Sequence, residues 1–104
     1  MYELMVENKF DSAHYLENYD GPCSRMHGHT YKVQVTICGE KLDEKVGMLL
    51  DFTQIKKHLN KIVDKLDHQL LNEVLDFNTT AELLAKYFYD ALILGAPLTS
   101  LLMI

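Results

Sequence analysis

The stretch HGHTYKVQVTI, residues 27–37, alternates between two kinds of side chain and predicts a β-strand with one buried face. Its odd-numbered positions from Tyr31 to Ile37 are apolar, whereas its even-numbered positions carry threonine, lysine or glutamine, apart from Gly28. Side chains two residues apart on a strand point to the same face, so His27 and His29 lie at the start of the apolar face. Both imidazoles can therefore reach one metal ion.

A second strand is predicted upstream, over residues 2–13, and its apolar residues share the even parity of His14. These residues are Tyr2, Leu4, Val6 and Phe10. The strand would deliver a third imidazole beside His27 and His29. A histidine pair at a strand end is more often plain surface chemistry. Three neutral nitrogens, however, leave one position of a tetrahedron open, which is typical of a catalytic zinc, so we expect Zn²⁺ on these three histidines.

Two amphipathic helices are predicted after the strands. The first has apolar residues on one side and lysines on the other, with either Asp51 or Thr53 as its cap. We expect it to bury Ile55, Leu59, Ile62, Val63 and Leu66. The second starts at Thr79, because Thr79-Thr-Ala-Glu82 fits a capping box, which favours a capping role for Glu82 over a ligand role. We expect it to bury Leu83, Leu84, Tyr87, Phe88, Ala91 and Leu92.

This order of elements predicts an α+β fold in which both helices cover one face of an antiparallel sheet. At 104 residues the chain has room for one domain, residues 1–104, and a domain this small gains from oligomerisation. It has neither the ~20-residue apolar run of a membrane span nor a secretory signal, so we expect a cytoplasmic protein without membrane attachment. Cys23 and Cys38 are then free thiols. A net charge of −5 without a basic cluster gives no footprint for nucleic acid.

Three motifs point to a known family. They are Phe10-Asp-Ser-Ala-His14, Cys23-Ser-Arg-Met-His27-Gly-His29 and Leu66-Asp-His-Gln-Leu-Leu-Asn72. Together they resemble the 6-pyruvoyl-tetrahydropterin synthase superfamily, and within it the bacterial branch of 6-carboxy-5,6,7,8-tetrahydropterin synthases of the queuosine pathway. In that branch a cysteine stands four residues before the first histidine of His-Gly-His, as Cys23 does here. The resemblance covers residues 1–92 and leaves residues 93–104 unplaced.

The resemblance implies a tunnelling-fold (T-fold) subunit with two strands, two helices and two further strands. Such subunits form trimers or hexamers with active sites between them. It also implies Zn²⁺ on the three histidines, a catalytic proton relay of Cys23, Asp67 and His68, and a pterin pocket near Thr80 and Glu82. Adjacent Asp67 and His68 need a turn to aim both side chains, and Asp67 could instead cap the residues that follow it.

The reaction that the resemblance implies converts 7,8-dihydroneopterin triphosphate to 6-carboxy-5,6,7,8-tetrahydropterin, with release of acetaldehyde and triphosphate. Two alternatives stay open. One is a 6-pyruvoyl-tetrahydropterin synthase, which keeps the side-chain carbons. The other is a zinc-binding but catalytically impaired, truncated homologue, because the family carries a pterin-binding glutamate on a late strand and no acidic residue follows Asp90 here. We expect the C-terminal strands to be missing or altered, with residues 98–104 forming at most one apolar strand.

Cys23 is the expected base of the reaction. An unperturbed thiol, with a pKa near ~8.5, is mostly protonated at neutral pH and needs a nearby cation or imidazole to act as a base. Cys23 falls in a predicted loop, residues 17–26, next to the expected metal site. Of the remaining residues, we expect Met26 to take part in packing, Tyr31 to extend the apolar face and His58 to be solvated.

Overall fold

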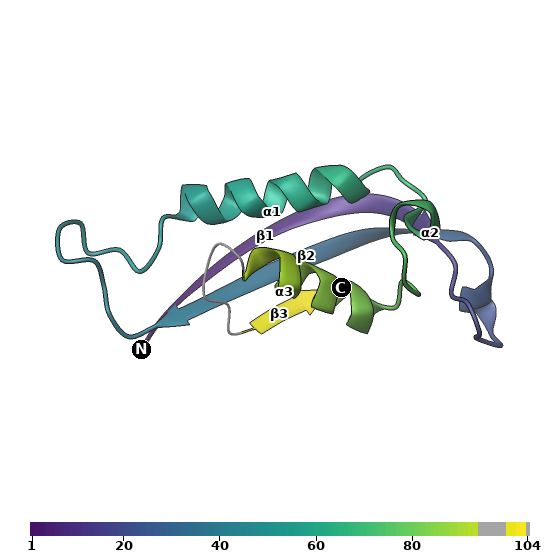
Figure 1. The fold of residues 1–104 in the computed structure, drawn as a ribbon, viewed down its shortest axis with the longest axis horizontal. Coiled ribbons are helices and arrows are strands. Elements are labelled where there is room, and N and C mark those ends of the chain that lie inside the picture. The colour runs from purple at the N-terminus through teal and green to yellow at the C-terminus, as the bar shows by residue number, and fades with distance from the viewer. Residues whose placement is uncertain (94–99, 104) are drawn as a thin grey trace.

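The computed structural model describes residues 1–93 and 100–103 of the chain. Its elements, in chain order, are β1 (Tyr2–His14), the 3₁₀ turn η1 (Pro22–Ser24), β2 (His27–Gly39), α1 (Phe52–Leu66), α2 (Leu71–Val74), α3 (Ala81–Leu92) and β3 (Ser100–Met103). The predicted α+β order of two strands followed by two amphipathic helices is confirmed (Figure 1). The elements η1 and α2 were not predicted, because a single turn is too short to show a hydrophobic period.

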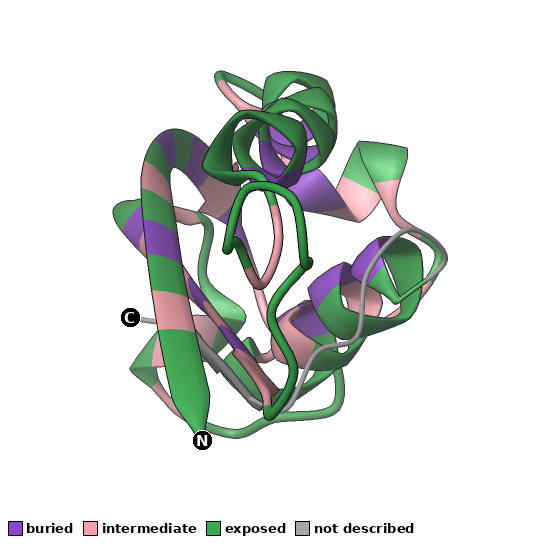
Figure 2. Cartoon of the chain, turned by 90° about the vertical axis from the view of Figure 1, so that its left-hand side faces the viewer, coloured by how far each residue is buried: buried purple, intermediate pink, exposed green. Residues whose placement is uncertain are grey.

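Strands β1 and β2 form one long antiparallel hairpin, in register from Tyr2 opposite Gly39 to His14 opposite His27. Strand β3 pairs antiparallel with the other edge of β2, which gives the sheet order β1-β2-β3. Helix α1 runs along β1, and the helices gather on one side of the sheet (Figures 1 and 2). The loop-connected end of the hairpin thus brings His14 and His27 together as a directly opposed pair.

The core lies between the helices and one face of the hairpin. It contains Val6 and Phe10 of β1, with Leu4 partly buried, the odd-numbered residues 31–37 of β2 and the apolar faces of α1 and α3, as the alternating pattern predicts. Tyr2, at the start of β1, shares this parity but is exposed. Its buried members are Val6, Phe10, Tyr31, Val33, Val35, Ile37, Ile55, Leu59, Ile62, Val63, Leu66, Leu71, Leu84, Phe88 and Leu92. Phe10 stacks on Tyr31 with ring centroids 4.9 Å apart. The histidines continue this packed face toward the hairpin end.

The helix caps resolve one alternative and correct one prediction. Asp51 caps α1, its side chain accepting a hydrogen bond from Thr53 N at 2.8 Å. Helix α3 is capped by Thr80, whose hydroxyl accepts from Leu83 N, so the predicted capping box that begins at Thr79 is wrong by one residue. Glu82 is therefore the second residue of the helix and takes no part in a capping box.

Three packing predictions are also wrong. Leu83 and Ala91 are exposed, because the buried stripe of α3 consists of Leu84, Phe88 and Leu92, one residue per turn. Met26 is 62% exposed, since it precedes β2 in a loop that leaves the core. His58 is exposed and Tyr31 is buried, both as predicted.

Strand β3 agrees with the prediction of one late apolar strand within residues 98–104, of which 98, 99 and 104 lie outside the described residues. Among the helices that the structure describes, none has the length and apolar character needed to cross a membrane.

Candidate metal centre and its surroundings

Three histidines meet at the end of the β1–β2 hairpin. His14 closes β1, His27 opens β2 opposite it, and His29 follows two residues later on the same face. The Nε2 atoms of His14 and His27 are 3.1 Å apart. The ring of His29 has its centroid 5.3 Å from that of His14 and 4.5 Å from that of His27. One nitrogen from each of the three rings lies within 4.8 Å of the others.

Backbone carbonyls fix the orientation of two of these rings. Nδ1 of His14 lies 3.0 Å from the carbonyl oxygen of Thr79, and Nδ1 of His27 lies 2.7 Å from that of Arg25. A carbonyl oxygen can only accept a hydrogen bond, so each Nδ1 carries the proton and donates it. Both Nε2 atoms then present lone pairs toward the same point. A metal cation between them would accept both lone pairs at once.

The spacing of the nitrogens fits a metal ion. Two imidazole nitrogens bound to zinc at about 2.0–2.1 Å and a tetrahedral angle lie about 3.3 Å apart. The 3.1 Å between His14 Nε2 and His27 Nε2 is close to that value. The rings are also tied through their second nitrogens, as metal-binding histidines usually are. The donor set, three imidazoles with one tetrahedral position left over, therefore suits zinc.

Burial favours the neutral imidazole in His14 and His29. The pKa of His14, which is only 6% exposed, is lowered by burial and further by the neighbouring His27, against the opposing effect of its hydrogen bond to Thr79. The pKa of His29 is also lowered, by burial and then by His27. Metal binding requires the neutral imidazole. At neutral pH both side chains are therefore ready to bind a metal ion without first losing a proton.

A cavity of about 340 Å³ opens beside the histidines and contains four further side chains of interest. Cys23 reaches it from η1, and Thr80 and Glu82 reach it from the start of α3. Glu82 forms no hydrogen bond or ion pair with any described residue, so its carboxylate is available to a ligand. The histidines, the thiol and both predicted substrate-binding residues thus share one cavity.

Tyr31 is the fourth of these side chains, and the sequence pattern alone treats it as packing. Its ring is buried against Phe10 and lies edge-on to His14 and His29, and it lines the same cavity. Burial raises the pKa of Tyr31 to about 12, so its hydroxyl stays protonated. Within the described residues this buried hydroxyl has no hydrogen-bond partner. A polar group on a bound molecule would supply one.

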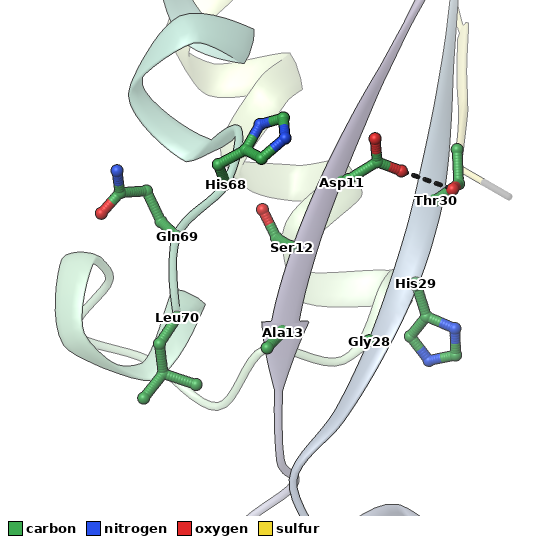
Figure 3. A pocket seen from close by; sticks show the side chains of 9 residues that line it. All are labelled: Asp11, Ser12, Ala13, Gly28, His29, Thr30, His68, Gln69 and Leu70. Atoms are coloured by element: carbon green, nitrogen blue, oxygen red, sulfur yellow. Dashed lines mark hydrogen bonds between the residues drawn. The ribbon is translucent and has the colours of Figure 1, made fainter.

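His68, which Asp67 contacts, lines a different groove of about 590 Å³ together with residues of β1 and β2 (Figure 3). Asp67 Oδ2 lies 2.9 Å from His68 Nδ1, and Asp67 Oδ1 accepts a hydrogen bond from the backbone N–H of Asp11. That N–H bond and then His68 lower the pKa of Asp67. The required turn is present, because His68 adopts a left-handed conformation with φ 56°. The alternative role for Asp67 is wrong, since α2 begins after Leu70 without a side-chain cap.

Within one chain, the three residues predicted to form the proton relay do not share one cavity. Cys23 lines the histidine cavity but not the groove, and His68 lines the groove but not the cavity. His29 and Thr30 of β2 line both, and in Figure 3 the two strands separate the rings of His29 and His68. The thiol and the Asp67–His68 pair are presented on two sides of the same hairpin end.

Comparisons with known proteins agree with this geometry. The family model described as 6-pyruvoyl tetrahydropterin synthase matches residues 3–96. The 6-carboxy-5,6,7,8-tetrahydropterin synthase of Haemophilus influenzae is 34% identical, covering 88% of this chain and 82% of that protein. The dihydroneopterin monophosphate aldolase of Pyrococcus furiosus is 33% identical, covering 90% of this chain and 77% of that protein.

A solved structure shows the same fold. The 6-pyruvoyl tetrahydropterin synthase of Caenorhabditis elegans matches with a TM-score of 0.78 at 28% identity, over 88% of this chain and 76% of that chain. The expected T-fold is thereby confirmed. The named relatives are all enzymes, yet their names describe three different activities, so similarity alone leaves the reaction to be argued from the site.

Proposed function

The chain belongs to the 6-pyruvoyl tetrahydropterin synthase family, and from that premise we propose that it is a zinc-dependent lyase acting on 7,8-dihydroneopterin triphosphate. The proposed products are 6-carboxy-5,6,7,8-tetrahydropterin, acetaldehyde and triphosphate, as a cytoplasmic step toward queuosine. The observation that carries the proposal is the meeting of three imidazoles, spaced to hold one metal ion, with the thiol of Cys23 in one cavity. The cysteine spacing, four residues before His27, favours the 6-carboxy branch.

His14, His27 and His29 are the proposed zinc ligands. A zinc ion held by them supplies Lewis-acid polarisation of oxygen atoms on the substrate side chain. The burial of His14 and the backbone tethers on His14 and His27 keep the ligand nitrogens in place before the ion arrives. Such preorganisation reduces the free energy lost in ordering the site.

Cys23 is the proposed base that removes a proton from the substrate carbon next to the polarised oxygen. It lines the cavity beside the three imidazoles, and a metal ion bound there would supply the positive charge that a cysteine needs to act as a base. Asp67 is proposed to orient His68 through the contact to Nδ1, which leaves Nε2 of His68 free to exchange a proton with the substrate. These roles need the thiol and His68 in reach of one substrate molecule.

The separation of the cavity and the groove is the reason to propose a shared active site. One subunit would supply the histidines and Cys23, and a second would supply Asp67 and His68, within a trimer or hexamer. The chain is elongated, with extents of 53 × 22 × 19 Å and a radius of gyration of 15.5 Å. A compact domain of this length has a radius of gyration of about 13 Å. A hairpin that extends this far is suited to association with other subunits.

Thr80 and Glu82 are the proposed contacts to the pterin ring. Glu82 lies in the wall of the cavity, free of any described partner. A carboxylate accepts two parallel hydrogen bonds from an amino-pyrimidine edge, and each charge-assisted bond contributes about 1.5–3 kcal/mol. Glu82 can therefore take the part that the family gives to a glutamate on a late strand.

The reaction is tested by incubating the zinc-loaded protein with 7,8-dihydroneopterin triphosphate and measuring triphosphate and acetaldehyde. Release of both supports the proposal. Triphosphate without acetaldehyde selects the 6-pyruvoyl synthase instead, which the Caenorhabditis elegans structure keeps as the second candidate. Tight zinc binding without either product selects the catalytically impaired homologue.

Subunit sharing is tested by mixing two inactive variants, Cys23→Ala and His68→Ala, under conditions in which subunits exchange. If the thiol and the relay come from different subunits, hybrid oligomers contain some intact sites and activity returns. If both come from one subunit, the mixture stays as inactive as its components.

A further inference from the structure

Thr79 makes a contact with His14 that the sequence pattern does not predict. Two acceptors of this one residue lie against Nδ1 of His14: the carbonyl oxygen at 3.0 Å and the hydroxyl Oγ1, also at 3.0 Å. Thr79 is fully buried and immediately precedes Thr80, the cap of α3. The contact joins residues 65 positions apart in the chain, from the end of β1 to the start of α3.

The contact determines which nitrogen of His14 faces the cavity. Since the Thr79 carbonyl must accept, Nδ1 carries the proton, and the hydroxyl oxygen shares that same N–H as a second acceptor. Nε2 is then left as the lone-pair atom. A hydrogen bond of this kind to the far side of an imidazole also raises the basicity of the ligating nitrogen, more so in a buried site.

The two tethered histidines differ in this respect. His27 is held by a single carbonyl, that of Arg25, and is half-buried at a loop. His14 is buried, and Thr79 holds it through both main chain and side chain. Packing alone does not require the second contact, because an isosteric valine would fill the same volume. What the hydroxyl adds beyond the shape of the side chain is a second hydrogen-bond acceptor for the Nδ1–H of His14.

We propose that Thr79 is a positioning residue of the metal centre, whose hydroxyl and carbonyl together lock His14 in the Nδ1–H tautomer and in the orientation that binds zinc. This role rests on the proposed metal site and extends it to a residue that touches neither the ion nor the substrate. It also couples the metal centre to α3, because the next two residues, Thr80 and Ala81, lead into the helix that places Glu82 in the cavity.

The experiment compares zinc affinity among the wild type, Thr79→Val and Thr79→Ser, by competition with a chromophoric chelator. Outer-shell partners of metal-binding histidines are typically worth about 10–100-fold in affinity. Because the carbonyl remains in Thr79→Val, we expect a loss at the lower end, about tenfold. Thr79→Ser keeps the hydroxyl and should stay close to the wild type. The visible spectrum of the Co²⁺-loaded proteins should change in the valine variant and recover in the serine variant.

Thr53→Val, at the exposed start of α1, is the matched control and should leave zinc affinity unchanged. If Thr79→Val does not fold, Thr79→Ala gives the same comparison with a smaller side chain. Equal affinity and equal Co²⁺ spectra in Thr79→Val and the wild type overturn the proposal, as do equal losses in the valine and serine variants. A wild type that binds zinc no better than His14→Ala overturns the metal site itself, and the role of Thr79 with it.

Discussion

The histidine cavity and the Asp67–His68 groove lie at the same end of one hairpin but are built in opposite ways. The cavity is organised by strand register: His14 is 6% exposed, and backbone carbonyls tether both His14 and His27. The groove is formed by a left-handed turn laid along the edge of β1, and the side chain of His68 there is 77% exposed. A single chain thus brings its three proposed metal ligands together, whereas the proposed proton relay would need a second subunit to complete it.

The largest expected effect is on the cavity. His27→Ala removes one of three ligands and should abolish zinc binding, with a loss larger than the roughly 10–100-fold that outer-shell changes cost. Metal analysis of purified protein measures it. His58→Ala, on the exposed side of α1, is the matched histidine control and should retain a full complement of zinc. Equal zinc content in both variants would contradict the proposal that zinc binds in the histidine cavity.

The second prediction separates metal binding from proton transfer. Cys23→Ala should keep zinc and the fold but lose turnover by a factor of roughly 10²–10⁴, the usual contribution of a positioned acid or base. Steady-state kinetics together with metal analysis test both halves.

Cys38→Ala, at the far end of β2 from the histidines, is the thiol control and should change turnover little. If Cys23→Ala protein came out without zinc, the thiol would be a metal ligand and not the base.

The alternating pattern predicted which side chains meet in the cavity, because the direction of a side chain on a strand depends only on its position in that strand. A strand has a side-chain period of two, so the parity of His27, His29 and Tyr31 follows from their positions alone. The pairing of His14 with His27 follows from the hairpin register, which the buried parity of both strands enforces.

The sequence was less informative where the local structure depends on a contact with a residue far away in the chain. Thr79 and Thr80 both suit a helix cap; Thr80 caps α3, while the hydroxyl of Thr79 is engaged by His14. That one-residue shift frees Glu82 for the cavity. Likewise the turn at Asp67 was foreseeable, but its direction depends on the bond from Asp11 N to Asp67, across 56 positions of the chain.

The third prediction concerns pH in the metal-free protein. The pKa values of His14 and His29 are lowered in the folded state from the ordinary 6.5, mainly by burial. The unfolded chain therefore takes up protons first as the pH falls, so stability is highest above about pH 6.5 and declines below it. Urea denaturation with a chelator present, between pH 7.5 and 5.5, should show this decline. The His14→Ala variant should show a shallower decline in stability with falling pH, whereas the His58→Ala variant should show the same decline as the wild type. A flat profile for the wild-type protein would mean that the cavity imposes no cost on a charged imidazole.

The smallest expected effect concerns the Tyr31 hydroxyl, a buried polar group in the wall of the cavity. Tyr31→Phe removes a buried hydroxyl that has no hydrogen-bond partner among the described residues. Leaving such a group unpaired costs about 1–3 kcal/mol, so its removal should leave the metal-free protein as stable as before or more stable by about 1 kcal/mol. The matched control is Tyr87→Phe, at a half-buried tyrosine of α3 outside the cavity, where the change should stay within about 0.5 kcal/mol. Urea denaturation compares the free energies of unfolding of the two variants.

With substrate bound, the loss of the hydroxyl should become unfavourable, because the Tyr31 hydroxyl then has a polar group to bind. The Tyr31→Phe variant should therefore show a raised KM. Destabilisation of the metal-free Tyr31→Phe protein by more than about 1 kcal/mol would mean that the hydroxyl is already paired, for example with a buried water, and is not reserved for a ligand.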